Sequence, residues 1–234
     1  MKALFTALSF LTIFPFPPLG DFKKAPGFFP LVGLFLGAVL WGISILVGKL
    51  PSYLVAFLIV LSLIILTRGL HLDGLSDACD ALMGGFTREE VLRIMRDPHT
   101  GAFGVMSIQT VIAGKVLFLI PLLPQKGVLF LFPMWGRTGV LLPMLFLPYL
   151  REQGKVSPFY PPKRGMTVFG LVLSGSVSFF LLGIRGLLGF GISLLYGFMV
   201  SFYYRRRLGG YTGDLLGALI ETTELVGLLC LNFF

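Results

Sequence analysis

Long apolar segments recur along the whole 234-residue chain and limit the folds that it can adopt. A membrane-crossing helix needs about 20 largely apolar residues, and its backbone must satisfy its own hydrogen bonds because the bilayer core holds no water. The segments do not alternate apolar and polar residues, as the strands of a membrane β-barrel would. We therefore predict about seven transmembrane helices, over residues 30–48, 53–70, 102–122, 127–148, 166–184, 186–203 and 215–231.

The composition supports a chain whose surface faces lipid. Hydrophobic residues make up 56% and charged residues only 13%, about half the charged fraction of a typical soluble domain. The stretch 3–14 is apolar but too short to span, and Pro15, Pro17 and Pro18 follow it. We predict an all-α polytopic integral membrane bundle that forms one domain over residues 1–234, with an interfacial or re-entrant helix at its N-terminus.

Basic residues lie mainly on one side of the predicted spans. That side carries Lys2, Lys23, Lys24, Arg68, Arg88, Arg93, Arg96, Arg151, Lys155, Lys163, Arg164, Arg205, Arg206 and Arg207, and the other side carries Lys49, Lys126 and Arg185. Loops rich in Lys and Arg stay in the cytoplasm. We therefore predict a multi-pass protein of the cell (inner) membrane with a cytoplasmic N-terminus and an external C-terminus. The net charge of +8 is explained by insertion and by anionic lipid, and we expect no nucleic-acid partner.

A first acidic cluster follows the second predicted span. Asp73, Asp77 and Asp80 stand at positions i, i+4 and i+7, so they share one face of a helix. Carboxylates on one stripe repel each other unless water or a divalent cation surrounds them, and such oxygen ligands suit Mg²⁺ with a substrate phosphate. We interpret the cluster as a magnesium site, with a solvated helix face as the alternative.

Basic side chains follow this cluster, in a predicted cytoplasmic active-site loop over about residues 71–101. Thr87 and Glu90 predict a capping box that starts a short helix. On that helix Arg93, Arg96 and Asp97 would share a face. Guanidinium groups beside a carboxylate metal site suit a diphosphate substrate, whereas pairing within the helix and contacts with lipid head groups are the alternative.

A second motif covers about residues 205–224. Gly209 and Gly210 allow the backbone to approach a ligand closely. The N-terminus of the helix that follows these glycines offers free N–H groups to an anion, and Asp214 belongs to the same segment. This motif is therefore a second candidate for substrate binding.

Two acidic residues, Glu221 and Glu224, lie inside the last predicted span. Carboxylates are costly within a membrane, so they indicate a functional site by default. Their partner is either a metal ion or one of the two cations that fall within other spans, Lys115 and Arg137. A purely structural salt bridge is the alternative.

Three motifs in the chain occur in a family-like order and spacing. They are His71 to Asp80 with its three aspartates, Ile94 to Asp97 leading into Gly101 to Gly104, and Gly209 to Gly217 with Glu221 and Glu224. Together they resemble the cobalamin synthase family, also called adenosylcobinamide-GDP ribazoletransferase, and the resemblance extends along the whole chain.

The resemblance implies a transferase that completes vitamin B12. The 3′-hydroxyl of α-ribazole, or of its 5′-phosphate, would attack the cobinamide-side phosphate of adenosylcobinamide-GDP and expel GMP, with Mg²⁺ as the metal. Asp73, Asp77 and Asp80 would then hold Mg²⁺, and Asp214, Glu221 and Glu224 would complete or face that site. His71 or one of the acids would take the hydroxyl proton. The candidate substrate contacts are Arg93, Arg96, Asp97, Arg137, Gly209, Gly210 and Thr212.

Two other functions remain open at this point. A CDP-alcohol phosphotransferase also uses a juxtamembrane acidic cluster, but after Asp77 and Asp80 the rest of its pattern is missing. A small-solute transporter would place charges inside its spans and show repeat-related broken helices. We find no convincing repeat, and the acids gather at one membrane face. Small residues, including many of the 30 glycines, would allow close helix packing within one subunit or within a homo-oligomer.

Overall fold

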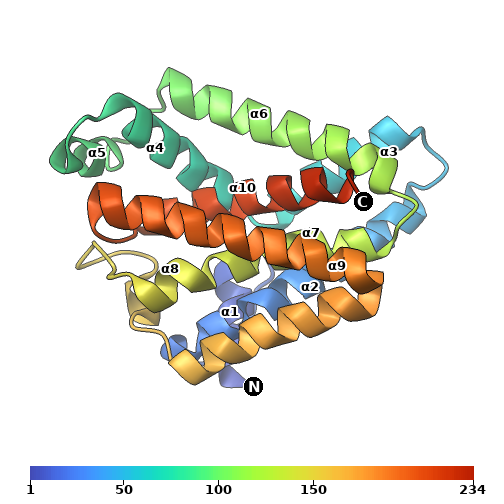
Figure 1. Ribbon diagram of the computed structural model, residues 1–234, viewed down its shortest axis with the longest axis horizontal. Coiled ribbons are helices and arrows are strands. Elements are labelled where there is room, and N and C mark those ends of the chain that lie inside the picture. The colour runs from blue at the N-terminus through green and yellow to red at the C-terminus, as the bar shows by residue number, and fades with distance from the viewer.

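The computed structural model describes residues 1–234 as an all-helical bundle (Figure 1), which confirms the predicted all-α class. One isolated parallel bridge, between Tyr149 and Tyr211, is the only β pairing. The helices are α1 (Lys2–Leu11), η1 (Phe22–Phe28), α2 (Phe29–Leu46), α3 (Ser52–Leu66), α4 (Leu70–Gly84), α5 (Arg88–Ile94), α6 (Ala102–Leu119), η2 (Ile120–Leu122), α7 (Gly127–Gly139), α8 (Leu141–Phe146), η3 (Ser157–Phe159), α9 (Arg164–Leu208) and α10 (Gly213–Leu231).

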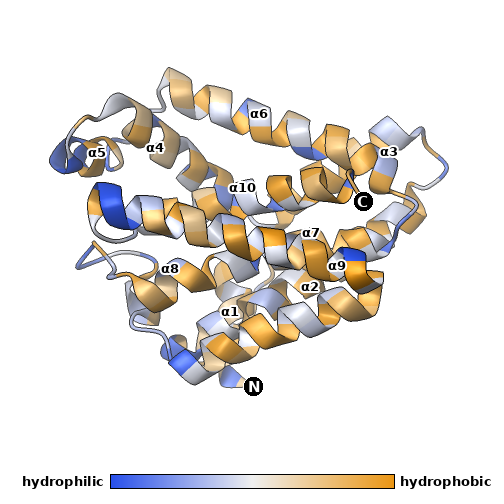
Figure 2. Cartoon of the chain, in the orientation of Figure 1, coloured by the Kyte–Doolittle hydropathy of each residue, from blue (hydrophilic) through white to orange (hydrophobic).

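Several helical segments are long and apolar enough to cross a membrane. Four qualify by length and composition: Phe22–Leu46, Ala102–Leu122, Gly127–Phe146 and Arg164–Leu208. The pair α3 and α4 makes a fifth if it counts as one span. Figure 2 shows that the long helices are mainly hydrophobic, while hydrophilic residues gather around α5 and at the two ends of α9. The chain therefore has the character of a multi-pass membrane protein.

The number of such segments differs from the predicted seven for two structural reasons. The predicted span 53–70 is interrupted, because Arg68 and Gly69 both have positive φ angles (56° and 63°) and α4 leaves α3 at an angle of 89°. The predicted spans 166–184 and 186–203 belong to one element, α9, which contains a single non-helical residue at Gly183. The predicted span 215–231 corresponds to α10, which carries three acids.

The long element α9 reverses direction at Gly183, so its two arms lie side by side (Figure 1). Gly183 has φ 58° and ψ −136°, which only glycine adopts readily. Glycines also allow the arms to approach: a Cβ at Gly186 would overlap the backbone of Ser178, and one at Gly175 would press on Phe190. The element is a helical hairpin of two antiparallel arms.

Helix α10 occupies the middle of the bundle and packs against α4, α6, α7 and α9. Its side chains are buried along most of its length. Glu221 and Glu224 are therefore placed among other helices, whereas Asp214 at the start of α10 is only partly buried.

The N-terminal stretch forms a helix, as predicted, and α1 contacts the break between α3 and α4. The Ile13 N–H donates to the carbonyl of Leu66 (2.7 Å), and the guanidinium of Arg68 donates to the carbonyl of Phe10 (3.4 Å). Ala7 and Leu11 are buried. The end of α1 thereby becomes one wall of the site described below.

Candidate active site

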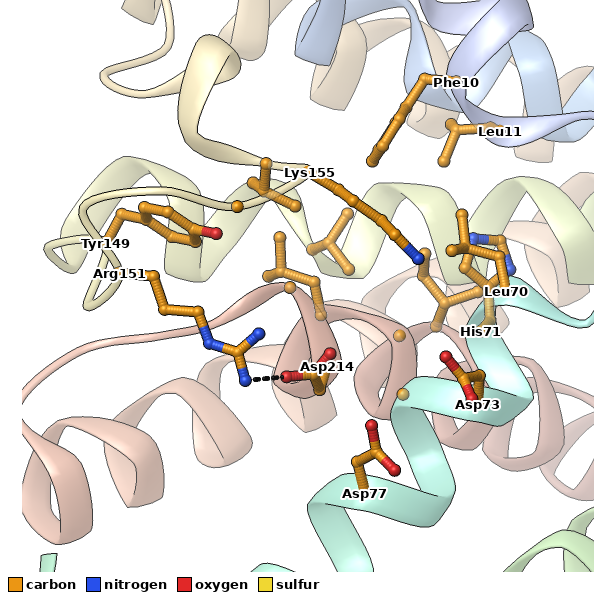
Figure 3. Close-up of a pocket in the computed structure, with 18 of the residues that line it drawn as sticks. Phe10, Leu11, Leu70, His71, Asp73, Asp77, Tyr149, Arg151, Lys155 and Asp214 are labelled. Atoms are coloured by element: carbon orange, nitrogen blue, oxygen red, sulfur yellow. Dashed lines mark hydrogen bonds and ion pairs between the residues drawn. The ribbon is translucent and has the colours of Figure 1, made fainter. Parts of the chain in front are cut away.

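A cavity of about 310 Å³ lies where the end of α1, the start of α4, the start of α10 and the loop 147–163 meet. Figure 3 shows that polar side chains enter it from several of these elements. The apolar part of its lining includes Phe10, Leu11, Val140 and Ile220. The polar part comprises His71, Asp73, Asp77, Tyr149, Arg151, Lys155 and Asp214.

Close packing of α4 on α10 brings carboxylates from the two sequence motifs together. A Cβ at Gly74 would lie 3.0 Å from the backbone of Asp214, and one at Gly217 would lie 3.1 Å from the carbonyl oxygen of His71. A side chain at either position would push the two helix backbones apart by a few tenths of an ångström, so glycine permits this close packing. As a result Asp73 and Asp77 of α4 line the same cavity as Asp214 of α10, as the sequence analysis expected.

Only one of these three carboxylates has a cation as its partner in the cavity. Arg151 donates to Asp214 (2.6 Å) and to the carbonyl of Met95 (3.2 Å). Asp73 and Asp77 form no ion pair, and neither does Lys155. Burial raises the pKa of Tyr149 in the nearby loop, and the charge of Asp214 raises it further against the opposing effect of Arg151. The cavity thus combines free carboxylates with a free ammonium group.

Asp80 points away from this cavity and caps α6. Its two carboxylate oxygens accept hydrogen bonds from the N–H groups of Gly101 (2.7 Å) and Gly104 (2.9 Å). A Cβ at either glycine would overlap the Asp80 carboxylate, and at Gly104 it would also overlap the Ser76 hydroxyl. The third aspartate of the predicted stripe therefore lies outside the cavity that Asp73 and Asp77 line, because the start of α6 packs against its carboxylate.

The two acids inside the predicted last span are paired with cations in the centre of the bundle. Lys115 of α6 donates to Glu221 (2.6 Å) and also to Glu224, and Arg137 of α7 donates to Glu224. Arg137 also contacts Nδ1 of His71 (3.2 Å). Both cations that the sequence analysis named thus serve as partners. Arg137 is fully buried and does not line the cavity.

The short helix α5 begins as predicted but ends early. The Thr87 and Glu90 capping box is present, and the N–H groups of Thr87 and Phe86 lower the pKa of Glu90. The helix stops at Ile94, before Arg96 and Asp97, so the expected face shared with Arg93 does not form.

None of the three expected residues of that face lines the cavity. Arg93 and Arg96 are exposed, and Arg96 borders a shallow depression next to Arg151. Asp97 accepts from the backbone N–H of His99 (3.0 Å) and pairs with its ring (2.7 Å), which lowers the pKa of Asp97. These residues instead lie at the surface, Arg93 in the last turn of α5 and Arg96 and Asp97 just after it.

The two glycines of the second motif serve the local fold, Gly209 through its backbone conformation and Gly210 through close packing. Gly209 ends α9 with φ 79°, and a Cβ at Gly210 would overlap the carbonyl of Pro148. The side chain of Thr212 accepts a hydrogen bond from the N–H of Leu215 (3.3 Å) and caps α10. The neighbouring Tyr211 exchanges backbone hydrogen bonds with Pro148 and Leu150. This pairing fixes the start of the loop 147–163 beside the cavity.

Two cationic residues of the cavity, Arg151 and Lys155, were not predicted as site residues. In the sequence they stand out only as basic residues of a predicted cytoplasmic loop. They reach the cavity because their loop pairs with Tyr211, which is far away in the sequence. No local pattern records that pairing, although a basic loop on the same predicted membrane face as the acids was the available signal.

A family model described as cobalamin-5-phosphate synthase matches residues 3–232. The chain belongs to this family. Similar proteins named adenosylcobinamide-GDP ribazoletransferase occur in Desulfitobacterium hafniense (strain Y51), with 36% identity over 98% of this chain and 96% of the relative, and in Acinetobacter baumannii (strain ATCC 17978), with 36% identity over 97% and 95%. The protein from Pseudomonas fluorescens (strain Pf-5) is 35% identical over the whole of both chains. No solved structure matches.

The cobalamin-5-phosphate synthase match covers every motif on which the resemblance in the sequence rested. It extends over α1 and the loop 147–163 as well, so all four elements that build the cavity fall within the matched residues.

Proposed function

We propose that this protein is an adenosylcobinamide-GDP ribazoletransferase, which completes the nucleotide loop of cobalamin. It joins adenosylcobinamide-GDP to α-ribazole or α-ribazole 5′-phosphate and releases GMP. The observation that carries the proposal is the family match from residue 3 to residue 232. The cavity supports it, because free carboxylates and cationic side chains face one another there, as a diphosphate-displacing site requires.

Different residues of the cavity would have different roles in this displacement. Arg151 and Lys155 would hold phosphoryl oxygens of the diphosphate, since both are cations on the cavity wall. The acceptor hydroxyl oxygen would bond to the cobinamide-side phosphorus while the bond from that phosphorus to GMP breaks, and GMP would leave with the bonding electron pair. The hydroxyl proton would pass to a carboxylate of the cavity.

The donor set of the cavity fits Mg²⁺. Asp73, Asp77 and Asp214 offer carboxylate oxygens on one cavity, and hard oxygen donors suit this ion. No three His, Cys, Asp or Glu side chains converge closely enough to hold an ion by themselves. Mg²⁺ commonly needs only one or two protein carboxylates, with water and substrate phosphates as its other ligands. When bound, the ion would neutralise charge that develops on the phosphates.

The apolar helices and the distribution of basic residues together support one topology in the membrane. We propose seven crossings, in which α3 with α4 forms one broken span, α9 forms two and α10 forms the last. The chain would then be a single domain in the inner membrane with lipid around it. The N-terminus, the loop 85–101 after α4 and residues 205–212 before α10 would be cytoplasmic, because most basic residues lie in these segments and in the loop 147–163. Hydrophilic residues gather around α5 and at the two ends of α9 (Figure 2).

The direct test is GMP release by the purified protein in lipid, with adenosylcobinamide-GDP, α-ribazole 5′-phosphate and Mg²⁺. We expect release to require the acceptor and to stop with EDTA. Asp77→Asn should lower turnover by about 100-fold or more, in the range found when charge-stabilising groups are removed. Asp21→Asn is the matched control, because Asp21 is remote, pairs only with Lys24 and has a left-handed backbone that Asn tolerates.

Other outcomes would overturn parts of the proposal. Absence of GMP release from folded protein would reject the transferase assignment. Equilibrium binding of adenosylcobinamide-GDP without release would favour a carrier, and undiminished release with EDTA would reject the role of Mg²⁺.

A further inference from the structure

We propose that His71 acts as a hydrogen-bond donor to a phosphoryl oxygen of the substrate, with its ring held in one tautomer by Arg137. In this role His71 is not the base that takes the hydroxyl proton, which was one alternative from the sequence. The inference deepens the proposed function and its substrate part rests on it, whereas the tautomer itself does not.

The contact between Arg137 and His71 fixes which ring nitrogen carries the hydrogen. A terminal guanidinium nitrogen of Arg137 lies 3.2 Å from Nδ1 of His71. A guanidinium only donates hydrogen bonds, so Nδ1 must accept with its lone pair. A neutral imidazole carries one N–H, which therefore sits on Nε2. The other group near Nδ1, Oε1 of Glu221, is 4.0 Å away, beyond hydrogen-bond range.

Arg137 is itself held in place on its other side. Its guanidinium donates to the Pro133 carbonyl (3.3 Å) and to Glu224, and Glu224 also accepts from Lys115. The Arg137 side chain is fully buried. Rotation of Arg137 away from His71 would break these contacts at a fully buried position, so the donor that faces Nδ1 is a fixed feature of the fold.

The Nε2 atom of His71 has no hydrogen-bond partner within the protein. It is buried, and the residue as a whole is 3% exposed. A buried N–H without a partner is unfavourable, and native proteins leave few of them. His71 belongs to the cavity wall, next to Leu70 and on the same helix as Asp73 (Figure 3). A ligand in the cavity can supply the missing acceptor, because His71 is one of the residues that line it.

The charges of the cavity indicate the chemical class of that acceptor. Arg151 and Lys155 line the same space as His71, and guanidinium and ammonium groups bind phosphate oxygens. During transfer the oxygen–phosphorus bond to the acceptor forms and the bond to GMP breaks, with the hydroxyl proton going to a cavity carboxylate. His71 keeps its Nε2 hydrogen throughout and donates it to the phosphoryl oxygen as negative charge grows there.

The tautomer can be measured without any substrate. The chain has only two histidines, and the His99 side chain is 89% exposed and outside the cavity. In His99→Gln protein labelled with ¹⁵N-histidine and placed in lipid, His71 gives the only histidine signals. We expect a protonated Nε2 and an unprotonated Nδ1. A ring protonated on Nδ1, alone or together with Nε2, would overturn the proposal.

The role of Arg137 as a positioning residue is tested in the same labelled background. Arg137→Met removes the donor that faces Nδ1, so a population protonated on Nδ1 should appear. A spectrum that stays purely Nε2-protonated would show that Arg137 does not select the tautomer. The spectrum of the His99→Gln protein remains decisive even if the added substitution disrupts folding.

Three replacements of His71 separate a donor from a base. Gln places an amide N–H near the position of Nε2, whereas Asn places its amide near Nδ1 and Ala has no donor. We expect His71→Gln to keep turnover within about tenfold of the native protein, and His71→Asn and His71→Ala to lose about 100-fold or more, as for a lost donor to developing charge. Thermal unfolding in lipid checks that all three fold.

The activities of the His71 variants decide whether His71 acts as a hydrogen-bond donor. If folded His71→Gln protein is as inactive as His71→Ala, the donor role is wrong. If the native protein releases no GMP at all, the proposed function fails, but the ¹⁵N measurement still decides the tautomer.

Discussion

Asp80 accepts hydrogen bonds from Gly101 and Gly104 at the start of α6 and so joins α4 to α6. We expect Asp80→Ala to lower the free energy of unfolding by about 1–2 kcal/mol, as loss of a helix N-cap does. Asp80→Asn keeps one acceptor oxygen and should cost less. Thermal unfolding of the purified variants in detergent measures the difference.

The same Asp80 variants distinguish a cap from a metal ligand. The Mg²⁺ concentration for half-maximal activity should not change in Asp80→Asn but should rise in Asp77→Asn. An equal rise of this Mg²⁺ concentration in both variants would show that Asp80 is a metal ligand, as its position in the sequence predicted.

Some residues of the candidate site could be predicted from the sequence and others could not. Asp73, Asp77 and Asp214 could be predicted because helical periodicity and the start of α10 are local patterns. Asp80 was grouped with them because it shares their helix face, whereas its contact with Gly101 and Gly104 at the start of α6 is a tertiary contact that no helical periodicity records. Lys155 was missed because a long-range pairing, between Tyr149 and Tyr211, brings its loop to the cavity.

At the scale of elements, ion pairs in the centre of the bundle join α10 to α6 and α7. We expect Glu224→Met to lower the free energy of unfolding by about 3–5 kcal/mol, because it leaves the buried charge of Arg137 uncompensated. The double variant Arg137→Met with Glu224→Met removes one charge of each sign and leaves the Lys115 and Glu221 pair intact. It should be less destabilised than the sum of the two single variants.

Unfolding of the four proteins of this cycle, measured in the same detergent, gives the coupling directly. Strict additivity of the single effects would show that Arg137 and Glu224 do not stabilise the packing of α7 on α10 through their charges.

The helices themselves were largely predictable, but their breaks were not. Hydropathy located apolar helices within a few residues, because lipid-facing surface must be continuous. It could not show that Arg68 and Gly69 turn the chain by 89° between α3 and α4, because apolar composition carries no information on backbone dihedral angles. The turn of α9 was expected between 184 and 186, and it lies at Gly183.

At the scale of the whole molecule, the basic residues predict which end of the bundle faces the cytoplasm. The test uses a background in which the two free cysteines, Cys79 and Cys230, are replaced by Ala. In spheroplasts, a membrane-impermeant maleimide should label Arg185→Cys at the α9 turn, whereas Lys163→Cys at its start should react only after permeabilisation. Both positions are exposed.

The opposite labelling pattern would reverse the proposed orientation. Labelling of both positions from the same side would show that the arms of α9 do not cross the membrane.

The ion pairs of α10 also bear on how the protein is made. Lys115 and Arg137 precede Glu221 and Glu224 in the chain, so a ribosome delivers both cations to the membrane before their counter-ions exist. An intermediate that has inserted α6 and α7 holds two unneutralised charges within its apolar helices, which is costly. Helix α10 follows α6 and α7 in the chain and carries the carboxylates that neutralise these charges, so its arrival completes the cavity and removes this cost in the same step.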